Sequence, residues 1–286
     1  MMDVREVQLV ELDMLKAVAE LCEKHGLQYT IYCGTLLGAV RHKGFIPWDD
    51  DIDVAMPLKD YRKFVKLANE LPERFFLQTL NNTKDYFNLW VQVCANGTTF
   101  MDRRLATLNT HMGISLDIYP FIGAFRNPRL VRLQQLMLET ARYLRSAKVH
   151  RFIPGKYPKA ERFVRIIPYF LRRLGSELLL KIAMRDPDKS ERIGTIDAAP
   201  FESKYPKEWW KEMTRLPFED TEFPAPAAYD KVLTRMYWNY MQLPPEAERK
   251  AHINEMTIVD TKRDFREYQR ELKQGLIHAD ESEDKT

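Results

Sequence analysis

The sequence has few cysteines, few glycines and no long apolar segment. Its three cysteines, Cys22, Cys33 and Cys94, are odd in number and far apart, which excludes a disulfide framework and favours reduced core thiols in a cytoplasmic protein. Only 11 glycines in 286 residues exclude collagen-like repeats. The longest nearly continuous apolar stretch, Ile166–Leu171, is far shorter than the roughly 20 residues of a membrane-spanning helix. Residues Met1–Glu6 include two acids and no apolar core, so we expect no secretory signal peptide.

The overall amino-acid composition is that of an ordinary globular protein. Hydrophobic residues make up 45% of the chain and charged residues 30%, a balance that allows a buried core within one or two domains. The charge is uneven, because residues 126–192 hold 17 Lys and Arg against 6 Asp and Glu. Apolar residues such as Phe163, Phe170 and Leu174 recur there at helical spacing.

Two interpretations of this basic region are open. Its helices either pack on the core with a basic outer face, or they contact anionic lipid or an anionic glycan at the inner surface of the membrane. No nucleic-acid-binding motif accompanies the charge, so nucleic acid is not an expected partner.

The most unusual stretch contains an acidic run that leads into a short strand. From Ile52 to Met56 apolar residues alternate with others, the pattern of a half-buried strand. Because successive side chains of a strand point to opposite faces, the apolar ones would lie on one side and Asp51 and Asp53 on the other. Asp49 joins them if the strand begins early. Neighbouring carboxylates repel one another, so such a cluster usually binds a cation, and oxygen ligands suit Mg²⁺ or Mn²⁺.

The segment before this run has the features of a phosphate-binding turn. Gly34 and Gly38 let the backbone approach a phosphate closely, and the residues after Thr35 can open a helix whose N-terminal amides face that phosphate. Arg41 and Lys43 add positive charge. A phosphate cradle followed by metal-binding acids predicts phosphoryl-transfer chemistry.

The phosphate-binding turn and the acidic run together form a longer sequence pattern. Residues 34–44 read Gly-Thr-Leu-Leu-Gly-Ala-Val-Arg-His-Lys-Gly, and residues 46–53 read Ile-Pro-Trp-Asp-Asp-Asp-Ile-Asp. This pattern resembles the signature of the LicD family, to which fukutin-like ribitol-phosphate transferases are related. The resemblance implies an α+β fold with a nucleotidyltransferase-like mixed β-sheet core, flanking helices and a basic helical region. We expect a catalytic core over residues 1–125, the basic helical region over 126–200, and the C-terminal part of the same domain, with a charged tail, over 201–286.

The resemblance also implies a function. LicD-family proteins are implicated in moving phosphocholine, or a related alcohol phosphate, from a CDP-activated donor to a surface glycan. For this chain it implies a phosphotransferase that depends on Mg²⁺ or Mn²⁺. The expected donor is a CDP-alcohol such as CDP-choline. The expected acceptor is a glycan or lipid-linked glycan, as in the biosynthesis of lipopolysaccharide or teichoic acid.

A second acidic strand completes the expected site. Residues 113–120 read Gly-Ile-Ser-Leu-Asp-Ile-Tyr-Pro, which predicts a strand with Asp117 at its middle. Nucleotidyltransferase-like folds commonly complete their metal site with a carboxylate from a neighbouring strand, and the resemblance makes Asp117 the candidate; the alternative is a surface acid on an edge strand. The expected metal ligands are Asp51, Asp53 and Asp117, which with Arg41 are also the expected catalytic residues. The expected substrate-binding residues are Gly34, Thr35, Gly38, His42 as a phosphate contact, Lys43, and Trp48, which either stacks on the base or anchors the loop.

The remaining strands and the C-terminal block are less distinctive. We expect strands at Leu27–Cys33, Phe75–Leu80, Leu89–Cys94 and Thr98–Met101, the last two joined by a hairpin turn at Asn96-Gly97. Residues 237–240 read Tyr-Trp-Asn-Tyr and precede Leu-Pro-Pro. They resemble the family's Tyr-Gly-Asp-Tyr-like run, with tryptophan and asparagine in place of glycine and aspartate.

Two other functions are open. A true nucleotidyltransferase would use the same metal geometry to attach a nucleotide to a sugar phosphate or a protein. A calcium-binding module is the second, because Asp49-x-Asp51-x-Asp53 matches the start of an EF-hand loop. Val54 and Asp60 stand where that loop needs Gly and Glu, which disfavours this interpretation.

Overall fold

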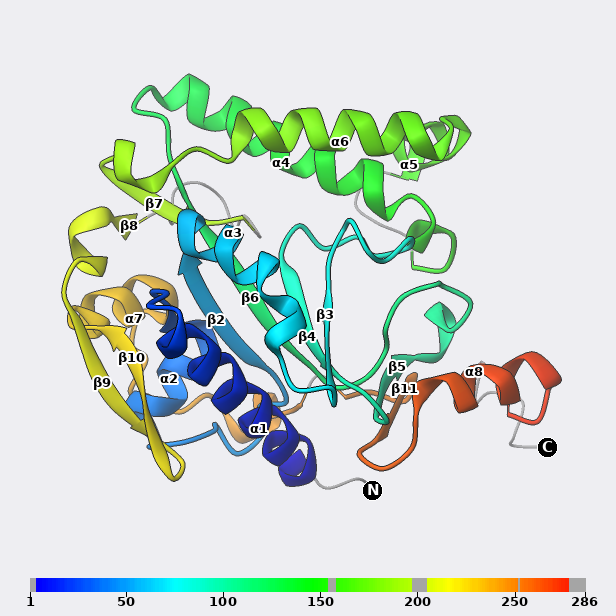
Figure 1. The fold of residues 1–286 in the computed structure, drawn as a ribbon, viewed down its shortest axis with the longest axis horizontal. Helices are drawn as coiled ribbons and strands as arrows, with labels where there is room; N and C mark the ends of the chain where they lie inside the picture. The colour runs from blue at the N-terminus through cyan, green and yellow to red at the C-terminus, as the bar shows by residue number, and fades with distance from the viewer. Residues whose placement is uncertain (1–3, 154–157, 197–204, 252, 278–286) are drawn as a thin grey trace.

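The computed structural model describes residues 4–153, 158–196, 205–251 and 253–277. Its centre is a mixed sheet of seven strands (Figure 1). These are β1 (Thr30–Ile31), β2 (Ile52–Pro57), β3 (Phe75–Gln78), β4 (Val91–Ala95), β6 (Ser115–Gly123), β7 (Arg192–Thr195) and β8 (Tyr205–Pro206). The order is β1-β2-β6-β4-β3, and β7 pairs with the second half of β6 and with β8. Strands β2 and β6 are parallel, and the other pairs are antiparallel. The predicted α+β fold with a mixed sheet is confirmed.

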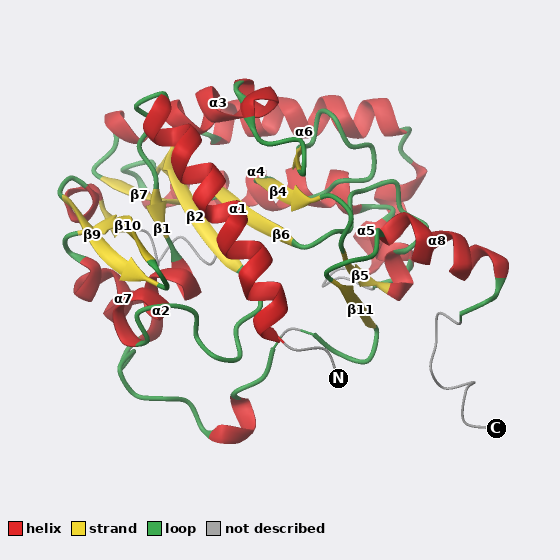
Figure 2. Ribbon diagram, turned by 60° about the horizontal axis from the view of Figure 1, so that its bottom comes forward, coloured by secondary structure: helices red, strands yellow, loops and turns green. Residues whose placement is uncertain are grey.

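Strands β2 and β6 lie in the middle of the sheet and are covered on both faces. Ile52, Val54, Ala55 and Met56 are all fully buried, so β2 is not the half-buried strand that its alternation predicted. Figures 1 and 2 show α1 (Val4–Lys24) lying across one face of the sheet, and α3 (Leu58–Lys66) packs beside it. Because β6 lies between β2 and β4, Asp117 is not on an edge strand.

The start of β2 is covered by a second group of elements. The helix α2 (Cys33–Arg41) packs against β2, against α7 (Tyr229–Tyr237) and against the hairpin of β9 (Met213–Phe218) and β10 (Thr221–Pro226). A separate two-stranded sheet pairs β5 (Thr99–Asp102) with β11 (Thr257–Asp260), next to α8 (Phe265–Gln274). C-terminal segments therefore pack against N-terminal ones in two places.

Two predictions about local structure are wrong, and the disfavoured calcium-binding alternative is excluded. Only Thr30–Ile31 of the predicted strand Leu27–Cys33 is β-structure, because the chain turns into α2 at Cys33. The turn at Asn96-Gly97 forms, with Gly97 at φ 74°, but β5 pairs with β11 and not with β4. The EF-hand alternative is wrong because residues 52–57 are a sheet strand and helix α3 follows directly.

The basic region contains three helices: α4 (Pro128–Ser146), α5 (Pro158–Ile166) and α6 (Tyr169–Ala183). Figure 1 shows α4 and α6 as a pair along one edge of the molecule, and the two helices pack on each other. Leu138 and Ala141 of α4 are buried, but the large apolar side chains of α5 and α6 are mostly exposed. The outer face of this region is therefore both basic and apolar, which differs from the first of the two interpretations. Among the described residues, no helix is both long and apolar enough to span a membrane.

Candidate functional site

The acids of β2 and β6 are brought together by the strand register. Asp53 and Asp117 are direct partners in the parallel pair, and side chains of paired residues point to the same face of a sheet. The Oδ1 atom of Asp117 accepts a hydrogen bond from Gln92 Nε2 at 2.8 Å, and its Oδ2 accepts one from the Tyr119 hydroxyl at 3.0 Å. Burial raises the pKa of Asp117 to about 6, and the charge of Asp51 adds to this effect. Asp51, Asp53 and Asp117 thus form one electrostatic group.

The first turn of α2 is fixed to the start of β2. The Thr35 hydroxyl oxygen accepts a hydrogen bond from the Asp53 amide at 2.8 Å, and the Tyr32 amide donates to the Asp53 carbonyl at 2.9 Å. A β-carbon on Gly34 would lie 2.7 Å from Asp49 Oδ2 and 3.9 Å from Asp51 Oδ1. A side chain at position 34 would therefore displace the Asp49 carboxylate, whereas Asp51 would stay at ordinary contact distance. Thr35, which we predicted to bind substrate, positions Asp53 through its hydroxyl group.

Two residues of α1 that the sequence analysis missed lie close to the acidic run. Gln8 Nε2 donates to the Asp49 carbonyl at 2.8 Å and to the Ile46 carbonyl at 3.2 Å. Glu11 is almost fully buried, and its Oε2 has no hydrogen-bond partner among the described residues. Burial raises the pKa of Glu11 well above its ordinary value, and the negative charges of the acidic run raise it further. A signal was present, because Glu11 follows the buried Val7 by four residues and so lies on the same helix face.

This buried carboxyl group makes stability depend on pH. Between pH 4.5, the ordinary pKa, and the raised pKa of the native state, the unfolded chain loses the Glu11 proton while the native state keeps it, so native stability falls as pH rises through this interval. We expect Glu11→Gln to be more stable than the unchanged protein, with an advantage that grows by about 1.4 kcal/mol per pH unit between pH 4.5 and the raised native pKa of Glu11. Urea unfolding in EDTA at pH 5, 6 and 7 measures this. Glu20→Gln, on the exposed side of α1, is the control; a constant advantage of Glu11→Gln across this range would contradict the prediction.

The donor chemistry of the acids suits a divalent cation. Asp51, Asp53 and Asp117 offer the hard oxygen ligands that Mg²⁺ and Mn²⁺ prefer. As the side chains lie, no three His, Cys, Asp or Glu residues in the described part of the chain are grouped closely enough to hold a metal ion by themselves. Magnesium usually takes one or two carboxylates together with water and substrate phosphates, and the paired Asp53 and Asp117 fit this mode. A bound metal ion stays a prediction.

Asp50, in the middle of the acidic run, has a different environment. It is buried, and its Oδ2 accepts a hydrogen bond from the Ile253 amide at 3.1 Å. Of the consecutive acids 49–51, Asp50 therefore anchors the C-terminal segment, while Asp49 and Asp51 lie at the site.

Positive charge lies at the other end of α2. Arg41 donates from Nη1 to the Tyr240 carbonyl at 2.9 Å and from Nε to His42 Nδ1 at 3.4 Å. Burial lowers the pKa of Arg41, and the nearby charge of Asp49 opposes this. Trp48 lies between two neighbours: the His42 ring meets it edge-on at 6.2 Å, and the guanidinium of Arg249 lies 5.5 Å from its ring centre. Trp48 also packs against the core, which accords with its anchoring interpretation. Sequence reasoning missed Arg249.

Two predicted substrate-binding residues have contacts that shape the loop. A β-carbon on Gly38 would lie 2.4 Å from the Gly44 carbonyl oxygen, so this glycine is explained by backbone packing without a phosphate. Lys43 is exposed, has a φ of 62°, and donates from Nζ to the Val40 carbonyl at 3.3 Å. The structure therefore brings neither residue to the acids.

The chain is similar in sequence to several known proteins. Residues 26–127 match the family model described as LicD/FKTN/FKRP, nucleotidyltransferase domain. This segment is a LicD-family domain. The chain is also similar to the lipopolysaccharide cholinephosphotransferase LicD of Haemophilus influenzae, with 29% identity over 87% of this chain and 95% of the relative. An uncharacterized protein of Rickettsia prowazekii is 37% identical over 28% of this chain and 29% of its own length. One of Rickettsia typhi is 44% identical over 21% of this chain and 19% of its own length.

The chain beyond the LicD domain contributes a tyrosine to the acidic site. Tyr237, the last residue of α7, is 41% exposed as a whole residue, but desolvation raises the pKa of its hydroxyl, and the nearby Cys33, Asp53, Asp49 and Asp51 raise it further. Its place follows from the reversal of the chain after α7, which lets the Tyr240 carbonyl reach Arg41 of the LicD domain. Asn239, where the family pattern has aspartate, is exposed and donates to Gln242 at 3.0 Å. Only the tyrosines of this block are thus near the site.

Trp238, at the position of the glycine in the LicD-family pattern, has a strained backbone. Its φ of 59° and ψ of −103° are favourable only for glycine, and its side chain is 85% exposed. Such strain costs about 1–3 kcal/mol, which glycine would relieve. Glycine also makes the unfolded chain more flexible, and this offsets part of the stabilisation. We expect Trp238→Gly to raise the free energy of unfolding by about 1 kcal/mol, measured by urea denaturation. Trp238→Ala keeps the β-carbon and should not stabilise; an equal gain in both variants would mean that strain is not the cause.

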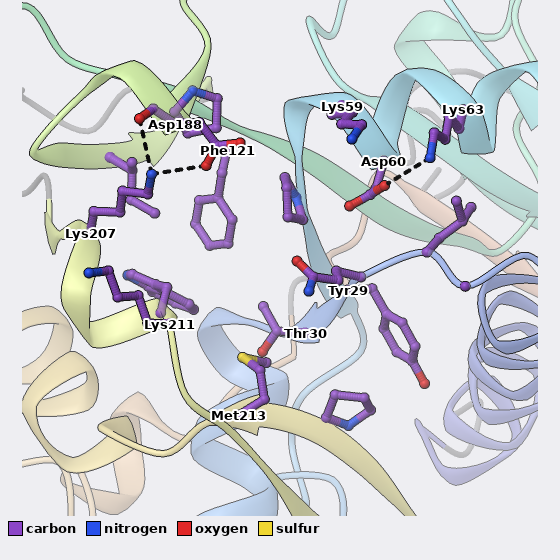
Figure 3. A pocket seen from close by; sticks show the side chains of 18 of the residues that line it. Tyr29, Thr30, Lys59, Asp60, Lys63, Phe121, Asp188, Lys207, Lys211 and Met213 are labelled. Carbon is purple, nitrogen blue, oxygen red and sulfur yellow. Dashed lines mark hydrogen bonds and ion pairs between the residues drawn. The ribbon is translucent and has the colours of Figure 1, made fainter.

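A separate hollow lies at the far end of the same strands (Figure 3). Its volume is about 740 Å³, and Pro57 and Phe121, register partners at the end of β2 and within β6, line it. Lys207 reaches into this region and pairs with Asp188 at 2.9 Å (Figure 3). The hollow shares none of its lining residues with the acidic site of the LicD domain.

Proposed function

We propose that this protein transfers phosphocholine, or a similar alcohol phosphate, from a CDP-activated donor to a hydroxyl group of a cell-surface glycan precursor such as lipopolysaccharide. The observation that carries the proposal is the register pairing of Asp53 with Asp117 inside a LicD-family domain. The similarity to a lipopolysaccharide cholinephosphotransferase extends over 95% of that relative, which supports the choice of donor and acceptor.

The acids have separate tasks in this proposal. Asp51, Asp53 and Asp117 would hold Mg²⁺ or Mn²⁺, which when bound neutralises charge on the donor diphosphate. The acceptor hydroxyl oxygen attacks the phosphorus that bears choline, the bond from that phosphorus to the CMP oxygen breaks, and CMP leaves. The hydroxyl proton passes to Asp117, whose pKa of about 6 leaves it ionised at neutral pH and within the useful range for a general base.

The neighbouring residues bind and orient the donor. The first turn of α2 has no side-chain cap, and in this proposal its amides bind the donor phosphates together with the cation. Arg41 faces the oxygens on which negative charge develops in the transition state. Trp48 and His42 line the donor-binding site next to Arg41, and the exposed Lys43 adds positive charge at its edge.

A nucleotidyltransferase is the second candidate, because the matched family domain carries that description. The two functions differ in the phosphorus that is attacked. Incubating the protein with Mg²⁺, acceptor lipopolysaccharide lacking phosphocholine, and CDP-choline labelled in either the choline or the cytidine distinguishes them. We expect the choline label on the acceptor and the cytidine label in free CMP. Cytidine label on the acceptor, with labelled CTP giving the same product, would establish nucleotidyl transfer.

The metal requirement is tested in the same reaction. EDTA should abolish the choline label on the acceptor, and added Mg²⁺ or Mn²⁺ should restore it. A panel of CDP-alcohols, with CMP release as readout, then identifies the alcohol that the pocket prefers. Full transfer in EDTA would contradict the assignment of the three aspartates as metal ligands.

A further inference from the structure

Helix α6 presents its large apolar side chains to solvent. Ser176 and Ala183 are the buried residues of this helix, and they face the molecule. The residues that share the opposite side are Phe170, Leu171, Leu174, Leu178 and Ile182. From Leu171 onward they recur every three or four residues, and Phe170 lies four residues before Leu174, so they form one continuous stripe. We call this stripe, with Phe163 and Ile166 of α5, the outer apolar face.

The outer apolar face is unusual for a surface in water. Its seven side chains are between 45% and 78% exposed, whereas a helix on the surface of a globular protein normally turns such residues inward. Of the 18 large hydrophobic residues exposed in the described part of the chain, 11 lie between Leu130 and Ile182. A concentration of this kind marks an interaction surface.

The charge beside this face indicates what binds there. Helices α4, α5 and α6 together contain ten Lys and Arg and three Glu. One of the acids, Glu177, already pairs with Arg173 at 2.8 Å and contacts Arg145 at 3.4 Å. Arg162 and Lys181 are exposed and lie next to the apolar residues in sequence. A second copy of the same face would bring two strongly basic surfaces together, which disfavours a dimer formed through it.

We propose that the outer apolar face docks on an anionic lipid membrane. The apolar side chains enter the boundary between headgroups and acyl chains, and the basic side chains contact lipid phosphates, as in helices that lie in the membrane interface. The proposal deepens the proposed function in one respect only: a protein held at the membrane reaches an acceptor glycan that is carried on a lipid. Binding to lipid itself does not depend on the reaction.

The first test measures binding to vesicles. The full chain is sedimented with vesicles of phosphatidylcholine alone and of phosphatidylcholine with phosphatidylglycerol, at low and high salt. We expect binding to the anionic vesicles that weakens with salt. The double variant Leu174→Gln/Leu178→Gln should bind at least about tenfold more weakly, and Arg162→Glu/Lys181→Glu should lose the preference for anionic lipid. Leu9→Gln and Leu276→Gln, at exposed leucines elsewhere, are the matched controls and should bind as the unchanged protein does.

Other outcomes would overturn the proposal. These are absence of binding to anionic vesicles, equal binding by Leu174→Gln/Leu178→Gln, or a dimer in solution that this variant converts to monomer. Circular dichroism and thermal unfolding establish that the variants are folded.

A second measurement separates this proposal from the proposed function. With a water-soluble acceptor glycan, the Leu174→Gln/Leu178→Gln variant should release CMP from CDP-choline at the unchanged rate. With acceptor embedded in anionic vesicles, its rate should fall at least about tenfold, in parallel with binding. A protein that binds vesicles but never releases CMP from CDP-choline would refute the proposed function and leave the docking face intact. An equal loss with both acceptors would refute the docking role.

Discussion

Asp53→Asn is expected to reduce phosphocholine transfer by at least about a thousandfold while the protein stays folded. The substitution removes one negative charge from the pair that Asp53 forms with Asp117 across β2 and β6. The substitution preserves the backbone bonds that tie Asp53 to the start of α2: its amide donates to Thr35 Oγ1, and its carbonyl accepts from the Tyr32 amide. Asparagine keeps both bonds and nearly the same volume. Asp51→Asn should have a comparable effect on transfer.

The measurement is the rate at which choline label reaches the acceptor at saturating donor, with thermal unfolding as the check on folding. Asp50→Asn is the matched control, because it makes the same chemical change three residues earlier, at a carboxylate that anchors Ile253. We expect this control to keep the bond from the Ile253 amide through the asparagine Oδ1 atom, to stay folded and to retain most of the transfer rate. Activity retained in Asp53→Asn would remove this residue from the mechanism. An equal loss in Asp50→Asn would mean that the total charge of the run matters more than the Asp53–Asp117 pair.

The positions of the acids could be predicted because they depend on local pattern. Alternation from Ile52 to Met56 predicts a strand, and the acid within residues 113–120 predicts another. Their pairing could not be derived from either pattern, since two strands 60 residues apart can be neighbours only if the rest of the sheet permits it. Here the family resemblance supplied the neighbour relation, and the parallel register of β2 and β6 confirms that the strands adjoin.

The errors have a common physical origin. Helical periodicity over Phe163–Ile182 identifies one apolar face, but it does not say whether that face meets the core or the surroundings. In α6 the small residues Ser176 and Ala183 face inward, where α4 packs closely. The turn at Asn96-Gly97 likewise fixes a change of direction and not a partner, so β5 could pair with β11 near the other end of the chain. Glu11 and Arg249 were missed because their role depends on such distant contacts.

Arg41→Ala is expected to lower kcat for transfer by about a hundredfold and to change the KM for the donor much less. The Nη1 and Nε atoms of Arg41 are held by the Tyr240 carbonyl and by His42, which fixes the direction of the guanidinium. A fixed charge stabilises the transition state more than the ground state if it faces oxygens where charge builds up during bond breaking. Single-turnover rates and donor binding measured separately distinguish the two effects.

The contact with Tyr240 complicates this variant, since its loss frees the segment after α7. Arg249→Ala is the comparison, because Arg249 lies over the Trp48 ring and carries the same charge without the bond to Tyr240. Tyr237 belongs to the same segment and lies near the acids, so a displaced segment would also alter its surroundings. If Arg41 stabilises the transition state directly, kcat falls in Arg41→Ala and not in Arg249→Ala, and the two variants have similar free energies of unfolding. An effect confined to KM would assign Arg41 to donor binding, and equal losses of kcat in both variants would assign the effect to the basic surroundings of Trp48 as a whole.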